Sequence, residues 1–142
     1  MNLIDRSKSR QLDKLVLATK IRLRRSSPFF AALALYAKAV FTRNVDVAAT
    51  NGHLILLHPE KYGNRTKNDR DVIFLHELLH AALLHPTRRG DRDPKIFNIA
   101  ADIVVNGMIA KEAQLKLPND AIRNEKIEHL SVEEIYKILM KE

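Results

Sequence analysis

The residues with the clearest chemistry are two histidines and a glutamate in one pentapeptide, His76-Glu77-Leu78-Leu79-His80. Residues four apart on an α-helix lie one turn above each other, so both imidazoles can reach the same metal ion. The glutamate beside the first histidine can hold a metal-bound water and accept its proton. The spacing predicts a zinc site with His76 and His80 as ligands and Glu77 as the general base of a hydrolase.

The motif lies inside an apolar stretch. Nearly every other residue between positions 72 and 84 is apolar, which is typical of a helix that is buried on all sides. Two imidazoles and a carboxylate in such a helix are costly unless a metal ion or hydrogen bonds satisfy them. We expect Asp69 or Asp71 to cap this helix, and we expect it to run to about His85, where Pro86 ends it.

A catalytic zinc ion takes three protein ligands and keeps one position open for water, so a third ligand is needed. The next predicted helix, residues 95–113, carries Asp102 in a polar line with Asn98 and Asn106, each four residues away. A polar line on an apolar helix must face a partner, and the motif helix is the natural one. We favour Asp102 as the third ligand, and expect Asn98 and Asn106 either to support the ligands or to hydrogen-bond the two helices together.

His85 is the alternative third ligand. In that arrangement Asp102 accepts a hydrogen bond from His76 or His80 and orients its ring. His85 follows His80 by five residues, so a continuing helix would rotate it about 140° away from the other rings. It reaches the metal only if the helix unwinds early, and we expect it instead to be an ordinary helix-end residue.

The rest of the pattern predicts an α+β fold, a compact and mostly helical domain with a small β-hairpin or sheet and a buried motif helix. Residues 9–25 and 29–41 have helical spacing. Asn51-Gly52 between two apolar runs is a strong hairpin signal, and residues 61–70 are polar, as in a loop. Ser131-Val132-Glu133-Glu134 has the pattern of a capping box that opens a last helix.

Composition limits the class of protein. A chain of 142 residues with 46% hydrophobic residues is long enough for one domain with a proper core. It has no cysteine, so a disulfide framework and thiolate ligands are excluded, and metal ligands must be histidine or carboxylate. The first residues lack the apolar run of a signal peptide, and no stretch is apolar enough to span a bilayer. We expect a cytoplasmic protein with no membrane partner.

The net charge of +7 is concentrated near the N-terminus. Residues 1–25 hold eight basic and two acidic residues, whereas the remainder of the chain is almost balanced. We therefore divide the chain into a basic N-terminal helix, residues 1–26, and a metal-binding domain, residues 27–142. The basic segment could contact nucleic acid or an acidic partner, or it could be a solvated helix face.

Several short segments carry a resemblance to a known family. They are Pro28-Phe29-Phe30, Ala48-Ala49-Thr50-Asn51-Gly52, Pro59-Glu60, His76-Glu77-Leu78-Leu79-His80 with His85, Arg88-Arg89-Gly90, Asp93-Pro94-Lys95, Asn98-Ile99-Ala100-Ala101-Asp102 with Asn106, and Glu133-Glu134-Ile135-Tyr136. In order and spacing they resemble the metallopeptidase domain found N-terminal to von Willebrand factor A-like domains in bacterial proteins. The resemblance implies a zincin-like fold, a Zn²⁺ cofactor, a peptide or protein substrate, and a partner protein that carries such an A-like domain. The basic segment lies outside it.

The function that follows is zinc-dependent hydrolysis of a peptide bond, with Glu77 as general base. In zincins an edge strand pairs with the substrate, and the apolar residues of the strand at 53–57 fit either that role or simple core packing, which we favour for Leu54 and Leu56. Candidate oxyanion stabilisers are Arg88, Arg89 and Tyr62. The alternative is a catalytically silent zincin-fold module that binds or regulates, associated with nucleic acid or a partner through its basic segment.

Overall fold

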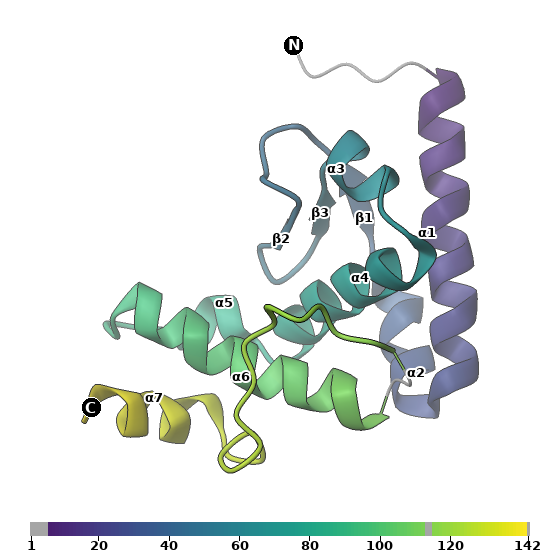
Figure 1. Cartoon of the computed structure of the whole chain (residues 1–142). Helices are drawn as coiled ribbons and strands as arrows, with labels where there is room; N and C mark the ends of the chain where they lie inside the picture. Colours follow the sequence, from purple (N-terminus) through teal and green to yellow (C-terminus); the bar gives the residue numbers. More distant parts are fainter. Residues whose placement is uncertain (1–5, 113–114, 142) are drawn as a thin grey trace.

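The computed structural model describes residues 6–112 and 115–141, and it has the predicted α+β composition (Figure 1). The helices are α1 (Arg6–Ser26), α2 (Pro28–Tyr36), α3 (Pro59–Gly63), α4 (Lys67–Ala82), α5 (His85–Arg88), α6 (Pro94–Glu112) and α7 (Val132–Met140). The strands are β1 (Ala39–Phe41), β2 (Ala48–Thr50) and β3 (Ile55–Leu57).

Helix α4, which carries the histidine motif, lies at the centre of the molecule. The sheet lies on one side of it and α6 on the other, while α1 runs past one end (Figure 1). Phe74, Leu75 and Leu79 of this helix are fully buried. The neighbours on several sides explain why the motif is embedded in an apolar stretch, because such a helix has little surface in water.

The start of α4 differs from the prediction that Asp69 or Asp71 caps it. Thr66 is the N-cap, and its hydroxyl accepts the backbone N–H of Asp69 at 3.2 Å. Asp71 lies in the second turn, where its buried carboxylate accepts hydrogen bonds from Thr19 and Arg22 of α1 at 2.6–2.8 Å. This aspartate is therefore an anchor between α1 and the motif helix.

The predicted hairpin is confirmed. β2 and β3 are antiparallel neighbours, and the turn between them contains Gly52 at φ +96°. The Asn51 side chain accepts the backbone N–H groups of His53 and Leu54, both at 2.8 Å. The connection between the strands has four residues, 51–54, and these two bonds satisfy two of its backbone N–H groups. The turn is therefore longer than the two-residue Asn-Gly turn of a tight hairpin.

Two boundaries were predicted wrongly around the sheet. The helix expected over residues 29–41 ends at Tyr36, and β1 then pairs in parallel with β3, giving the strand order β1-β3-β2. The loop expected over residues 61–70 is shorter, because α3 begins at Pro59 with His58 as its cap. Local hydropathy does not determine either of these short elements. β1 depends on a distant partner strand, and α3 depends on a side-chain cap.

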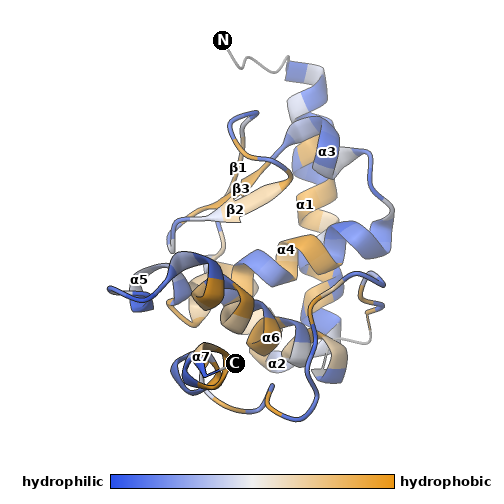
Figure 2. Cartoon of the chain, turned by 60° about the vertical axis from the view of Figure 1, so that its left-hand side comes forward, coloured by the Kyte–Doolittle hydropathy of each residue, from blue (hydrophilic) through white to orange (hydrophobic). Residues whose placement is uncertain are grey.

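A second core joins α6 to α7. Phe97 and Ile103 of α6 are buried against Val132 and Ile135 of α7. The predicted capping box is present, since Ser131 accepts the N–H of Glu134 and the Glu134 carboxylate accepts the N–H of Ser131. Figure 2 shows the hydrophobic residues gathered where the helices and strands face one another.

Helix α1 extends the predicted helix by a few residues at its start and packs against α2, α3 and α4. Its buried face is the predicted one, formed by Leu12, Val16, Thr19 and Leu23. The boundary proposed after residue 26 coincides with the end of α1, and a division into two units stays a prediction. Among the helices that the structure describes, none is long and apolar enough to cross a membrane.

Glu60 of α3 provides a pH-dependent link to α1 and to the segment that follows β1. Its carboxylate accepts hydrogen bonds from Arg43 and from Lys8, which lower its pKa to about 2. The folded state thus favours the ionised form, so the stabilisation is complete above the ordinary pKa of about 4.5 and is lost as the pH falls towards 2. We expect Glu60→Gln to lower the midpoint of thermal unfolding at pH 7, and we expect this difference from wild type to vanish near pH 2. A difference that is constant across this range would contradict the link.

Candidate metal centre

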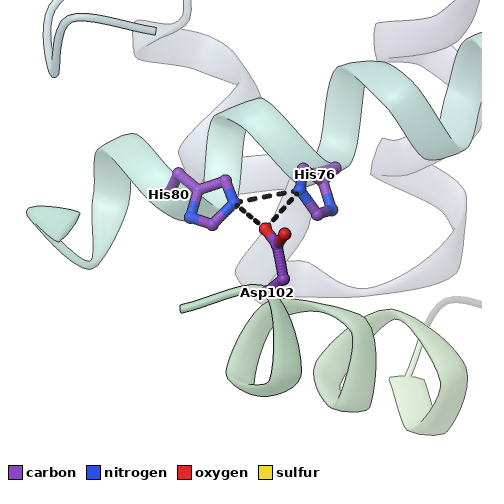
Figure 3. A group of neighbouring side chains, drawn as sticks. All are labelled: His76, His80 and Asp102. Atoms are coloured by element: carbon purple, nitrogen blue, oxygen red, sulfur yellow. Dashed lines mark hydrogen bonds and ion pairs between the residues drawn. The ribbon is translucent and has the colours of Figure 1, made fainter. Parts of the chain in front are cut away.

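The structure brings His76 and His80 of α4 together with Asp102 of α6 (Figure 3). The two imidazole Nε2 atoms are 2.9 Å apart. Asp102 Oδ1 lies 3.2 Å from Nε2 of His76 and 3.0 Å from Nε2 of His80. A tetrahedral zinc ion with bonds of about 2.0–2.1 Å separates its ligands by roughly 3.3 Å, so this triangle has the right dimensions.

Hydrogen bonds orient the ring of His76. The backbone carbonyl of Ile122 can only accept, so the Asn106 amide donates to it through Nδ2 at 2.8 Å. Asn106 Oδ1 then faces Nδ1 of His76 at 3.1 Å, and Nδ1 must carry the proton that is donated. In a neutral imidazole this leaves a lone pair on Nε2, directed at His80 and Asp102.

His85 supports His80 from the other side. Helix α4 ends at Ala82, and Leu84 takes the left-handed conformation at φ 60°, which turns the chain sharply. The turn places buried His85 with its Nδ1 atom 2.9 Å from Nδ1 of His80. The expectation of an ordinary helix-end residue is wrong, because the helix unwinds one turn earlier than predicted. His85 therefore contacts Nδ1 of His80, which is the ring nitrogen of His80 that faces away from the triangle.

The electrostatics of the group favour a cation. Burial raises the pKa of Asp102, but the close imidazoles of His76 and His80 outweigh it and hold that pKa well below its usual range. Burial lowers the pKa of His85 to about 4, so this ring is neutral and can accept a hydrogen bond. A carboxylate oxygen and two imidazole lone pairs that converge at about 3 Å repel one another unless a proton or a metal ion lies between them. The donor set therefore fits a metal ion.

Glu77 lies beside the triangle and has an unsatisfied carboxylate. Within the described residues, its Oε2 atom is buried and has no hydrogen-bond partner. Burial raises the pKa of Glu77, although the neighbouring charges of His76 and His80 oppose the shift. A buried carboxylate without a partner is costly, and such groups are typical of functional sites.

Two cavities meet at Glu77. One, of about 380 Å³, is lined by His80, His85, Asn98 and residues of β2. The other, of about 390 Å³, extends towards residues 117–122, and both include His76, Glu77 and Asp102 in their walls. The two cavities form one groove across the candidate metal centre.

The strand that borders this groove is β2. Of the two roles considered for residues 53–57, that of an edge strand is excluded, because β3 lies between β1 and β2 and is paired on both sides. Ala48, Ala49 and Thr50 of β2 line the groove. β2 has an open edge at this side of the sheet. Its small side chains gave no hydropathy signal that could have identified it as the bordering strand.

Other predicted site residues lie elsewhere. Asn98 is exposed on the cavity wall and, among the described residues, makes no hydrogen bond to the three central side chains. Arg88 pairs with Glu133, Tyr62 is fully buried in the core, and Arg89 is exposed outside both cavities. The three oxyanion candidates therefore do not face the groove. Asn106, by contrast, bonds to His76 across the two helices and to the backbone carbonyl of Ile122.

Comparison with known families agrees with this geometry. The model of a family described as "Putative metallopeptidase domain" matches residues 11–142. The chain belongs to this family. The match covers the residues that line the groove and most of α1, so it extends further towards the N-terminus than the segments that carried the resemblance.

An uncharacterized protein of Thermotoga maritima is 30% identical to this chain over 112 residues. The match covers 74% of this chain and 28% of the relative, so the chain spans about a quarter of that protein's length. No solved structure matches the chain.

The two asparagines on either side of Asp102 provide a matched test of the candidate metal centre. Asn106→Leu keeps the shape of the side chain but removes the hydrogen bond to His76, so we expect zinc affinity to fall about 10- to 100-fold. Asn98→Leu makes the same change on the exposed wall and is expected to leave the affinity unchanged. Competition with a chromophoric chelator measures both. Equal losses for the two variants would show that Asn106 does not support His76.

Proposed function

We propose that this domain is a zinc-dependent metallopeptidase that hydrolyses peptide bonds. The observation that carries the proposal is the Glu77 carboxylate, whose buried Oε2 atom has no hydrogen-bond partner among the described residues, beside three convergent metal-ligand atoms in an open groove. This arrangement fits metal-assisted hydrolysis, in which a base must lie next to the activated water. The family to which the chain belongs supports a hydrolase and a metal cofactor.

The residues proposed to hold the ion are His76, His80 and Asp102, with Asn106 and His85 orienting the two rings. Zn²⁺ suits nitrogen and carboxylate ligands, and when bound it lowers the pKa of a coordinated water to about 7 and polarises a carbonyl. His85 as a fourth ligand is disfavoured, because its near nitrogen faces Nδ1 of His80 and not the triangle.

Glu77 is proposed as the general base. Its carboxylate borders both halves of the groove, so it can accept a proton from water and pass it to the leaving amine. Burial keeps the carboxylate free of competing hydrogen bonds and raises its pKa, which makes it a stronger base.

The open edge of β2 is proposed to bind the substrate main chain. In an antiparallel ladder, every second residue of a strand forms hydrogen bonds with its partner strand. The N–H of His58 donates to the carbonyl of Val47 at 2.8 Å, so Ala49, two residues further along, also bonds to β3. The backbone groups of Ala48 and Thr50 then point away from β3, towards the groove. An extended peptide can add to this edge by main-chain hydrogen bonds.

The experiment that tests the proposal compares wild type with Glu77→Gln. We expect both proteins to contain stoichiometric zinc, and we expect the variant to cleave a denatured protein substrate about 10²- to 10⁴-fold more slowly, because the base is lost. Elemental analysis and mass spectrometry of the products measure the two quantities. Equal cleavage by the two proteins would remove Glu77 from the mechanism.

Partners and location are part of the proposal. Three of the eight basic residues near the N-terminus are bound within the fold, since Lys8, Lys20 and Arg22 pair with Glu60, the carbonyl of Ala37 and Asp71. A nucleic-acid or acidic partner would use the exposed ones, which are Arg6, Arg10, Lys14, Arg24 and Arg25. A partner with a von Willebrand factor A-like domain and a cytoplasmic location rest on the sequence alone.

A further inference from the structure

The two halves of the groove differ in chemistry. The half near His80 has polar walls that include Thr50, His85 and Asn98. The half beyond His76 is walled mainly by apolar side chains. A groove that is polar on one side of the reacting centre and apolar on the other distinguishes the two sides of a bound peptide.

The segment after α6 supplies much of the apolar half. Leu117, Pro118, Ala121 and Ile122 line it, and Ile122 remains 41% exposed although it is apolar. Val72 and Ile73 of α4 face them across the cavity of about 390 Å³. An open, apolar cavity that shares Glu77 and Asp102 with the candidate metal centre is suited to a side chain of the substrate.

This wall is held in place at both ends. The Asn68 side chain donates to the carbonyl of Lys116 at 2.8 Å and accepts its N–H at 3.2 Å. At the other end, Asn106 donates to the carbonyl of Ile122 at 2.8 Å. The wall is therefore formed before a ligand arrives, and binding does not have to order it.

The direction of β2 identifies which substrate residue would enter. The apolar half lies at the Val47 end of the strand, and the polar half reaches its Thr50 end. Antiparallel pairs outnumber parallel ones. A peptide that is antiparallel to β2 runs from the Thr50 end to the Val47 end. Its residues on the carboxyl side of the cleaved bond then lie over the apolar half.

We propose that residues 115–122, together with the facing side chains of α4, form a subsite for a bulky apolar side chain immediately after the cleaved bond. The substrate class is thus peptides with a residue such as leucine, isoleucine, phenylalanine or methionine at that position. Exposed Asp120 at the cavity wall disfavours an acidic side chain there. This inference rests on the proposed function, since it assumes a metal ion beside Glu77.

The test uses two succinyl hydroxamate N-methylamides, one with an isobutyl side chain and one with hydrogen, measured by calorimetry on the zinc-loaded protein. The hydroxamate anchors each compound at the metal, so only the side chain differs. We expect the isobutyl compound to bind about 10- to 100-fold more tightly, because a leucine-sized group is buried. Ala121→Phe should fill the subsite and remove this preference, while the hydrogen compound and the zinc content are unaffected.

Controls separate the inference from the proposed function. Ala32→Phe makes the same substitution at an exposed position of α2, outside the cavities, and should keep the preference. Ile122→Ala removes apolar wall from an exposed position and should reduce the preference even if Ala121→Phe does not fold. Equal binding of the two compounds to wild type would overturn the subsite alone. Failure of zinc-loaded wild type to bind either compound would remove the proposed function and the subsite with it.

Discussion

Protein in which Asp102 is replaced by alanine is expected to contain less than stoichiometric zinc after purification, and the same holds for His76→Ala and His80→Ala. Each change removes one of three atoms that converge on the proposed ion. We expect zinc affinity to fall by more than the roughly 100-fold limit that applies to supporting residues. Peptide cleavage should disappear with the metal. Elemental analysis and a chelator competition measure the loss.

His85→Ala is the matched comparison for the ligand variants. His85 contacts His80 and not the triangle, so its loss should weaken zinc by about 10- to 100-fold and leave stoichiometric metal in a zinc-supplemented preparation. If His85→Ala loses the metal and Asp102→Ala keeps it, the third ligand is His85. Wild type without stoichiometric zinc would remove the proposed metal centre altogether.

The second large effect is on stability and lies outside the groove. Asp71→Ala is expected to lower the free energy of unfolding by about 3 kcal/mol, because it leaves the Arg22 guanidinium and the Thr19 hydroxyl without their buried partner. Urea denaturation followed by circular dichroism measures the change. The side chain of Arg22 is 29% exposed, so water compensates part of the loss.

Two further variants show whether the ion pair or the packing matters. Asp71→Asn keeps the size of the side chain and can still accept the Thr19 hydroxyl, so it should cost less than Asp71→Ala. Replacing Arg22 and Asp71 together with methionine and leucine should recover most of the stability, because a well-packed apolar pair removes both charges. If the double replacement is as unstable as Asp71→Ala, the hydrogen bonds and the ion pair of Asp71 themselves stabilise the fold, and an apolar pair does not replace them.

The centre of the predicted site follows from helical periodicity. His76 and His80 are four residues apart on a helix that had to be buried. Asp102 is the acidic residue in the polar line of the other apolar helix. Asn106 was included for the same reason, since it continues that polar line. Local spacing within helices is a strong signal, and the structure brings these four side chains together.

The parts that sequence reasoning missed depend on where the chain turns. The role of His85 depends on the left-handed residue Leu84, a conformation that a leucine side chain gives no reason to expect. β1 depends on a parallel partner more than ten residues later, which local hydropathy does not reveal. Asp71 was assigned to a cap because short polar residues favour that position, yet a contact with Arg22, 49 residues earlier, determines its role.

The position of the groove was also beyond prediction. Its edge strand consists of small residues, Ala48 to Thr50, whose pattern indicates neither burial nor exposure. Residues 115–122 had no regular pattern in the sequence, and hydrogen bonds to two asparagines, with Leu115 and Leu117 packed on the core, place them beside His76. Irregular segments of this kind take their conformation from the surface they cover.

The proposed ligands and both residues that orient them are close together along the chain. His76 and Asp102 are 26 residues apart, and His85 and Asn106 fall within or just beyond that interval. Closing a loop of this length costs little more entropy than closing a much shorter one, because the cost grows only with the logarithm of length. A bound ion would therefore join α4 to α6 at a small cost in chain entropy, so the same three atoms that hold the metal would also stabilise the packing of the two helices.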